Sequence, residues 1–210
     1  MNITILGATG WIGGEITTQA LLRNHQVTAI ARNTEKLIAE NVTLKNFDLQ
    51  SDDDIAPLLA GADVVIASIG GRAAGNHKLV ARTAKRLLAA LSGSNTRLLW
   101  VGGAGSLEVS AGVTLVSSPD FPAEYKDEAL AQGEALNVFK TTNTATQWTF
   151  VSPAAVIYPG ASEGPYRIGG DEFFTNEQGE SKISVTDYAI AMLDEAQHAA
   201  HINQRISVAY

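Results

Sequence analysis

The feature that most constrains the fold is a glycine-rich stretch near the start of the chain, Gly7-Ala8-Thr9-Gly10-Trp11-Ile12-Gly13-Gly14. It follows a short apolar run, residues 2–6, that has the character of a β-strand. After it, Ile12, Ile16 and Ala20 recur at helical spacing. The glycines at positions 7, 10 and 13 therefore lie where a strand is predicted to turn into a helix.

Such a turn has a chemical consequence, because the first amides of a helix lack helical partners and carry partial positive charge. A phosphate fits there when no side chain blocks its approach. Gly7 would permit the tight turn, Gly10 the close approach of a pyrophosphate, and Gly13 the packing of helix on strand. With a second strand predicted at 27–31, the spacing predicts dinucleotide binding. The alternative is a glycine-rich turn that holds no ligand.

The residue after the second strand bears on the choice of dinucleotide. Sites that prefer NAD carry an acidic residue here for the ribose 2′-hydroxyl, whereas an arginine suits the 2′-phosphate of NADP. This chain has Arg32, followed by Asn33, and no acid. A guanidinium can also bind a phosphate through two parallel hydrogen bonds. The sequence therefore favours NADP(H) over NAD(H), unless Arg32 is only a solvated loop residue.

The remaining periodicity predicts an α/β chain with a Rossmann-type, doubly wound parallel sheet. Further strands are expected at 42–47, near the sheet edge, and at 63–69, 97–101 and 148–151, the run 63–69 being central because it is almost continuously apolar. Helices are expected from about 54 to 61, over 79–91, over 122–140 and around 189–196. Ser184 and Asp187 have capping-box spacing ahead of the last of these helices. Residues 1–210 are expected to form one NAD(P)-binding domain, in which about 155–185 make a loop-rich lid on the substrate side.

Composition excludes several classes of function. The 210 residues are 45% hydrophobic and 18% charged, which is typical of a globular domain. A net charge of −7 argues against a nucleic-acid partner, and the absence of cysteine excludes thiolate sites and fits the cytoplasm. No apolar run approaches the ~18 residues that span a bilayer, and no basic segment suggests a secretory signal. No metal site or membrane partner is expected.

Six short motifs together carry a family resemblance: residues 7–13, Ala31-Arg32-Asn33, Phe47-Asp48-Leu49, Val101-Gly102-Gly103-Ala104, Ser152-Pro153-Ala154 and Ile183-Ser184-Val185-Thr186-Asp187-Tyr188. With these motifs the chain resembles the atypical short-chain dehydrogenase/reductases of the NAD(P)H-binding, NmrA-like group. Within that group it is similar to the bacterial NADH-flavin reductases and, more distantly, to biliverdin reductase B. The resemblance extends over essentially the whole chain.

The resemblance implies a role in cofactor binding for sixteen positions. Pyrophosphate contacts are implied for the first turn, a 2′-phosphate contact for Arg32, adenine or adenosine contacts for two loops, and nicotinamide contacts for two more. In chain order these positions are Gly7, Thr9, Gly10, Trp11, Ile12, Gly13, Arg32, Asp48, Leu49, Ser68, Ile69, Gly70, Gly102, Gly103, Ser152 and Pro153. For Gly102 and Gly103 the alternative is a turn that merely needs glycine.

The chain departs from the superfamily at the catalytic positions. The usual active site pairs a tyrosine with a lysine four residues later, which lowers the phenol pKa for proton transfer. No tyrosine here has that lysine, which argues against a common alcohol dehydrogenase or sugar epimerase. The serine and histidine of the biliverdin-type reductases are matched by Ala104 and Ala154. Tyr125 remains the one candidate acid, against the alternative that it packs on a helix face with Ala129 and Leu136.

Three functions stay open from the sequence. An NADPH-dependent reductase of a flavin or a quinone-like acceptor fits the missing acid, because the acceptor ring spreads the incoming charge and water can supply the proton. A non-catalytic redox sensor that holds NADP(H) fits equally well. An isomerase or dehydratase would need a proton-transfer group that the sequence does not display. The acceptor, the protein partners and the oligomeric state are left open.

Overall fold

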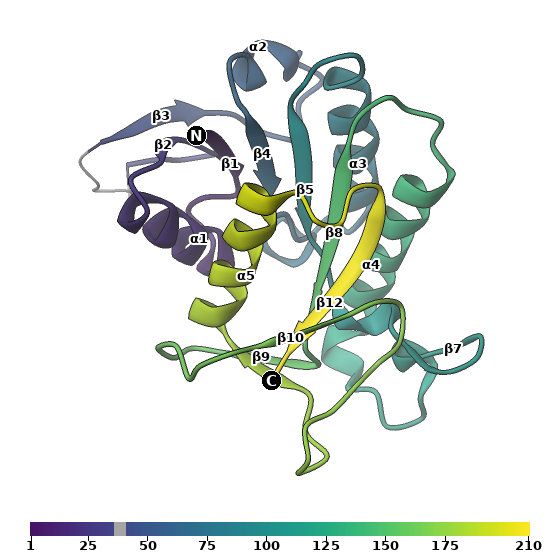
Figure 1. Ribbon diagram of the computed structural model, residues 1–210. Coiled ribbons are helices and arrows are strands. Elements are labelled where there is room, and N and C mark those ends of the chain that lie inside the picture. The colour runs from purple at the N-terminus through teal and green to yellow at the C-terminus, as the bar shows by residue number, and fades with distance from the viewer. Residues whose placement is uncertain (36–40) are drawn as a thin grey trace.

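A mostly parallel sheet of eight strands forms the centre of the molecule (Figure 1). The computed structural model describes residues 1–35 and 41–210. The strand order is β10-β12-β8-β5-β4-β1-β2-β3, and the described strands are parallel except β10, which pairs antiparallel with β12. Their bounds are β1 Asn2–Leu6, β2 Gln26–Ala31, β3 Val42–Asn46, β4 Val64–Ala67, β5 Arg97–Val101, β8 Trp148–Pro153, β10 Arg167–Gly169 and β12 Gln204–Ala209.

Helices cover both faces of this sheet. On one face lie α1 Trp11–Leu22 and α5 Val185–His198, which come from opposite ends of the chain. On the other face lie α2 Ala56–Leu59, α3 Lys78–Ala90 and α4 Ala123–Thr141. An ion pair between Arg23 Nη1 and Asp194 Oδ1, at 2.7 Å, joins the end of α1 to α5. The three layers confirm the predicted doubly wound architecture.

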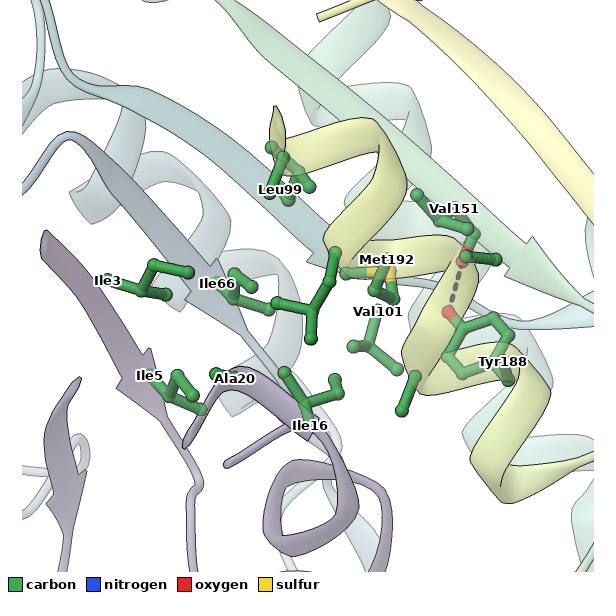
Figure 2. Packing of buried hydrophobic residues seen from close by; sticks show 14 of the residues in the cluster. Ile3, Ile5, Ile16, Ala20, Ile66, Leu99, Val101, Val151, Tyr188 and Met192 are labelled. Atoms are coloured by element: carbon green, nitrogen blue, oxygen red, sulfur yellow. Dashed lines mark hydrogen bonds between the residues drawn. The ribbon is translucent and has the colours of Figure 1, made fainter. Parts of the chain in front are cut away.

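The core between the sheet and the α1–α5 layer is drawn in Figure 2. Strand alternation decides which side chains enter it, so that Ile3 and Ile5 of β1 face α1 and α5 while Leu6 belongs to the opposite core. Within this core the Tyr188 hydroxyl donates a hydrogen bond of 2.7 Å to the Val151 carbonyl oxygen (Figure 2). Complete burial raises the pKa of Tyr188, which keeps its proton at neutral pH.

Several local predictions are confirmed. Strand β3 lies at the sheet edge, and all four residues of β4 are buried between neighbouring strands and two helical layers. Helix α5 begins at a side-chain cap, in which the Ser184 hydroxyl oxygen accepts a hydrogen bond of 3.0 Å from the Asp187 amide. Sequence spacing is sufficient for these features because each leaves a local pattern: an alternating run at β3, a continuous apolar run at β4, and a serine three residues before an aspartate at α5.

Other boundaries differ from the prediction. Helix α2 spans only Ala56–Leu59 instead of 54–61, because Asp54 turns back to accept a hydrogen bond of 3.0 Å from the Ala56 amide. The sixth strand expected at 148–151 continues through Pro153 as β8. The sequence also missed β9 Val156–Tyr158 and the hairpin formed by β6 Glu108–Ser110 and β7 Val113–Thr114.

The segment 155–185 contains three short strands in addition to its loops. Strand β9 pairs in parallel with β11 Lys182–Ser184, and β10 extends the main sheet beyond β12. In Figure 1 the segment runs along the lower side of the view, past the carboxyl ends of β8 and β12. It therefore follows the edge of the sheet at which ligands bind in doubly wound folds. None of the helices in the described residues is long and apolar enough to cross a membrane.

Candidate functional site

The turn between β1 and α1 is shaped by two glycines that no other residue could replace without strain. Gly7 has a φ of +78°, and a Cβ on it would lie 2.1 Å from the Ser68 carbonyl oxygen. A Cβ on Gly13 would lie 2.2 Å from the Gly7 carbonyl oxygen, so Gly13 allows the helix to sit against the turn. Both glycines therefore serve the close approach of β1, α1 and the loop after β4.

Gly10 differs from these two glycines. A Cβ there would meet only the Gly7 carbonyl oxygen, at 3.2 Å, so one side of the turn is open. Gly10 is the N-cap of α1, where no side chain caps the helix and no acidic residue lies in the first turn. Thr9 and Trp11 are exposed beside it, and Ile12 is partly buried against the core. The amides at this helix start thus remain available to an anion, which fits a pyrophosphate.

The strand order places this turn at the switch point of the sheet, where β1 lies between β2 and β4. The Ser68 amide donates to the Leu6 carbonyl oxygen at 2.9 Å, so the loop after β4 begins directly beside the turn. Residues Ser68, Ile69 and Gly70 form that loop. The structure therefore brings together the first turn and the loop that the resemblance assigns to the adenosine.

Arg32 follows β2 at the same end of the sheet, and its side chain is exposed. The loop after it is fixed by Asn46, whose Oδ1 accepts hydrogen bonds from the Thr34 amide at 3.1 Å and the Thr34 hydroxyl at 2.8 Å. Asp48 accepts a hydrogen bond of 2.9 Å from the Gln50 amide, and Leu49 is partly buried. The sequence missed the Asn46–Thr34 contact, which sets the position of the Arg32 loop.

The loop after β4 is held from α4 by a carboxylate that sequence reasoning also missed. Glu128 Oε2 accepts hydrogen bonds of 2.9 Å from the Gly71 amide and from the Arg72 amide. A Cβ on Gly70 would lie 3.1 Å from Glu128 Oε1, so Gly70 makes room for this carboxylate. His77 Nε2 lies 3.5 Å from Glu128 Oε2. Glu128 thus fixes the loop that borders the switch point.

The glycines after β5 are explained by packing inside the protein. A Cβ on Gly102 would lie 2.1 Å from Phe150 Cε1, and one on Gly103 would lie 3.2 Å from the Gln132 Cβ. Gln132 is itself buried, since its Nε2 donates to the Ile69 carbonyl oxygen at 2.8 Å and its Oε1 accepts from Trp100 Nε1 at 2.9 Å. The Phe150 ring occupies the space that a Gly102 side chain would fill, so packing by itself accounts for this glycine, and its contact with a nicotinamide stays a prediction.

Ser152 and Pro153 end β8 and are buried. The Ser152 hydroxyl lies 3.5 Å from Arg205 Nη1, so it faces the interior and leaves only backbone for a ligand. Arg205 is buried on β12, and its Nε donates a hydrogen bond of 2.7 Å to Asp171 Oδ1. Burial alone would raise the pKa of Asp171, but hydrogen bonds from Lys140 and Arg205 outweigh it and hold that pKa below its usual value.

Tyr125 lies in the first turn of α4 with 51% of its surface exposed. The Arg72 guanidinium carbon is 4.8 Å from the centre of its ring. The structure therefore corrects the alternative that Tyr125 packs on a buried face, because Leu136 is buried while Tyr125 is covered only in part by Arg72. A catalytic role for Tyr125 stays a prediction.

The other tyrosines near this end of the sheet are poor candidates for proton transfer. The Tyr158 hydroxyl donates a hydrogen bond of 2.6 Å to Glu163 Oε1, and the Tyr166 hydroxyl donates one of 2.5 Å to Asp194 Oδ2. Burial and these carboxylates raise the pKa of both phenols. Within residues 1–35 and 41–210, no three histidine or carboxylate side chains gather where they could hold a metal ion.

Comparison with known proteins shows the family to which the chain is similar. The model of a family described as NAD(P)H-binding matches residues 7–196, a range that begins at the first glycine of the turn. The protein YwnB of Bacillus subtilis is 41% identical over 214 residues, which cover 99% of this chain and 98% of YwnB.

Two solved structures have nearly the same fold. One, described as a "putative NADH-flavin reductase" from Streptococcus pneumoniae, has a TM-score of 0.90 and 38% identity, with 100% of this chain and 99% of that chain covered. The other, described as a "putative epimerase" from Bacteroides thetaiotaomicron, has a TM-score of 0.90 and 36% identity, with 100% and 96% covered. Since these two proteins are named for different reactions, the fold alone does not decide the chemistry.

Proposed function

The chain belongs to the NAD(P)H-binding family, and from this premise we propose that it is an oxidoreductase that passes hydride from NADPH to a flavin or a quinone-like acceptor. The one observation that carries the proposal is the turn from β1 to α1. There, close packing of the backbone requires Gly7 and Gly13, whereas Gly10 and the uncapped start of α1 face an open side. The pyrophosphate of a dinucleotide fits that combination.

A bound reduced nicotinamide would supply a hydride to the acceptor ring, which then takes up a proton from water. The protein's own task is to bind both molecules, align them and exclude water. The described residues at the ends of β5 and β8 suit that task, because Ala104 and Ala154 carry no titratable group and Gly103 adds no side chain. The 155–185 segment, which follows β8 along the same edge, is proposed to serve as the lid.

The preference for NADPH over NADH is proposed from Arg32. Its side chain is exposed at the end of β2, beside a loop that Asn46 fixes through Thr34. A guanidinium held at this position suits the 2′-phosphate, which NADH lacks. The pneumococcal relative is named for NADH, so the preference needs its own measurement.

A redox sensor without turnover is the second candidate. The observation that favours it is that Tyr158 and Tyr166 donate to carboxylates while Ala104 and Ala154 replace the polar pair of the biliverdin-type enzymes. A sensor needs tight nucleotide binding and a partner, and it needs no acceptor. A single measurement, the consumption of NADPH in the presence of an acceptor, therefore distinguishes the two functions.

The decisive experiment measures NADPH oxidation by its absorbance with FMN, FAD and a simple quinone. The test variant is Gly10→Val, whose side chain would cover the open side of the turn, and the matched control is Gly14→Ala, whose Cβ meets only ordinary contact at 3.5 Å. Turnover that falls about tenfold or more in Gly10→Val and persists in Gly14→Ala supports the reductase. Nucleotide binding without turnover of any acceptor would establish the sensor instead.

A further inference from the structure

An arginine of α3, Arg86, contacts the loop 47–53 that follows β3. Its Nη1 donates hydrogen bonds of 3.0 Å to the carbonyl oxygens of Leu49 and Ser51. Its Nη2 donates a hydrogen bond to the Asp53 carbonyl oxygen. The loop contains neither helix nor strand, so its carbonyls have no regular backbone partners. One guanidinium therefore holds three backbone carbonyls of this loop in place.

The same guanidinium lies over an aromatic ring at the start of the loop. The Arg86 guanidinium carbon is 5.7 Å from the centre of the Phe47 ring, and Phe47 packs against the core on the α3 side of the sheet. The Phe47 amide donates a hydrogen bond of 2.9 Å to the Ala31 carbonyl oxygen, at the end of β2. Arg86 thus joins Leu49 to Phe47, and through Phe47 to the end of β2.

A second arginine of α3, Arg82, contacts the same loop nearer to solvent. Its Nη2 donates a hydrogen bond of 3.1 Å to the Ser51 carbonyl oxygen and lies 2.5 Å from Asp52 Oδ1. The Arg82 side chain is 41% exposed and the Asp52 side chain is fully exposed, so water screens this ion pair. Of the two arginines, it is Arg86 that binds the Leu49 carbonyl.

The position of this loop connects it to the nucleotide site. Strands β1, β2 and β3 are parallel, so the loop after β3 lies at the same edge of the sheet as the glycine turn after β1. The family resemblance implies adenine contacts for Asp48 and Leu49, and Leu49 also packs against the core on the α3 side. Since binding depends on contact groups held in a fixed position, the residue that holds their backbone affects affinity without touching the ligand.

We propose that Arg86 is the positioning residue for the adenine end of the nucleotide, whose guanidinium fixes the loop 47–53 so that Asp48 and Leu49 meet the adenine. The inference rests on the proposed function and deepens it by naming the support of one end of the cofactor site. Because its nitrogens donate to backbone carbonyls, Arg86 acts on the nucleotide through the loop. The loss in an Arg86 variant should therefore be confined to nucleotides and fragments that carry adenine.

The test measures binding by calorimetry, so that its result does not depend on turnover. The ligands are NADP⁺ and 2′,5′-ADP, which keeps the adenine and the 2′-phosphate and lacks the nicotinamide. The variants are Arg86→Ala, Arg86→Lys and the matched control Lys85→Ala, which removes an exposed cation from the neighbouring position of the same helix. Leu49→Ala is measured alone and combined with Arg86→Ala, because residues that act through one contact have non-additive effects. Chemical denaturation checks that each variant is folded.

Arg86→Ala should bind NADP⁺ and 2′,5′-ADP about tenfold more weakly than the wild-type protein, and Lys85→Ala should stay within about twofold. Arg86→Lys should lose about threefold, because an ammonium cannot hold three carbonyls at once. The double variant should lose less than the product of the two single losses.

Turnover supplies a second readout that a purely structural role would not produce. In Arg86→Ala the KM for NADPH should rise about tenfold while kcat stays unchanged, because the adenine contact is equal in the ground state and the transition state. The mononucleotide NMNH, which lacks adenine, should be oxidised equally well by Arg86→Ala and the wild-type protein.

Other results would overturn the inference. If folded Arg86→Ala binds 2′,5′-ADP as the wild-type protein does, the positioning role is wrong and the proposed function is unaffected. If the losses in Arg86→Ala and Leu49→Ala multiply, Arg86 does not act through this part of the loop. If Arg86→Ala fails to fold, an unchanged affinity in Arg86→Lys refutes the role instead.

The failure of the proposed function gives a different result. A wild-type protein that binds NADP⁺ and oxidises no NADPH is not a reductase, whereas the binding measurements still decide the role of Arg86. A wild-type protein that binds neither NADP⁺ nor 2′,5′-ADP refutes both proposals.

Discussion

Two glycine-bearing turns at the same edge of the sheet look alike in sequence and differ in what their glycines do. In the first, after β1, Gly7 and Gly13 let backbone approach backbone, and Gly10 leaves one side open. In the second, after β5, Gly102 and Gly103 make room for Phe150 and Gln132 of the protein itself. A glycine that admits a ligand and a glycine that admits a neighbouring side chain cannot be told apart from the sequence alone.

The difference shows why the sequence pattern is more informative for the first turn than for the second. At the first turn, Gly7 and Ala8 of the same short stretch fill the space beside Gly13, while Ser68 of the loop after β4 fills the space beside Gly7. At the second turn the residues that fill the space lie on α4 and β8, tens of residues further along the chain. Local spacing therefore accounts for part of the first turn, whereas tertiary packing accounts for both glycines of the second.

The largest effect in this comparison is expected from Gly7→Ala. The new Cβ would lie 2.1 Å from the Ser68 carbonyl oxygen, which is backbone and cannot rotate away, and φ is +78°. Strain in the left-handed region and overpacking together should lower the free energy of unfolding by about 3–5 kcal/mol. Chemical denaturation checks this value. A loss below about 1 kcal/mol would mean that the turn is more adaptable than its geometry indicates.

The next effect is expected at Arg32, which tests the ligand side of the first turn. Arg32→Ala should weaken NADPH binding by about 1.5–3 kcal/mol and leave NADH binding nearly unchanged, because only NADPH offers a 2′-phosphate to the guanidinium. Titration calorimetry with both nucleotides measures the difference. Arg32→Lys keeps the charge but cannot form two parallel hydrogen bonds to a phosphate. Its NADPH affinity should therefore lie between those of the wild-type protein and Arg32→Ala. Equal losses for both nucleotides would refute the assignment.

Gly102→Ala tests the second turn. A Cβ 2.1 Å from the fully buried Phe150 ring should lower the free energy of unfolding by about 1–3 kcal/mol and leave nucleotide affinity unchanged in the folded protein. Combining it with Phe150→Leu should recover part of the loss, since the smaller side chain frees the space. A stable variant that loses nucleotide binding would show that Gly102 serves a ligand after all.

The smallest effect is expected from Asp171→Asn, in the 155–185 segment. The pKa of Asp171 is lowered in the folded protein, so its contribution is present above the usual value of 3.8 and is lost as the pH falls through the lower folded value. Because its side chain is 52% exposed, the contribution should be below about 1 kcal/mol. The midpoint temperature of unfolding, measured from neutral to acidic pH, should therefore fall slightly less in the variant than in the wild-type protein. An unchanged acid profile would show that the Arg205 and Lys140 contacts contribute nothing.

Most of the fold could be predicted from the sequence because strands and helices here carry clear periodicity. The buried β4, the edge strand β3 and the cap at Ser184 each leave a pattern within a few positions of the chain, and at the β1–α1 turn the approach of Gly13 to Gly7 is equally local. The predicted helix boundary was wrong where a side chain competed with the backbone for an amide hydrogen bond, as the Asp54 carboxylate does at the start of α2.

The supports of the candidate site could not be predicted. Glu128 holds the loop after β4 from 57 residues away in the chain, and Gln132 reaches Ile69 across 63 residues. Neither residue belongs to a motif, and each looks like an ordinary polar position on an amphipathic helix. Long-range contacts of this kind leave no periodic signal, so only the folded chain reveals them.

The pairing of α1 with α5 also affects how the molecule can be assembled during synthesis. The glycine turn leaves the ribosome well before α5, yet α1 contacts residues 185–198 through the Arg23–Asp194 ion pair and the contact of Glu15 with Thr186. A nascent chain that stops short of α5 therefore exposes one apolar face of the sheet. Nucleotide in the cell can stabilise the domain by mass action only after α5 has emerged, which makes α5 the helix that commits the domain to its folded state.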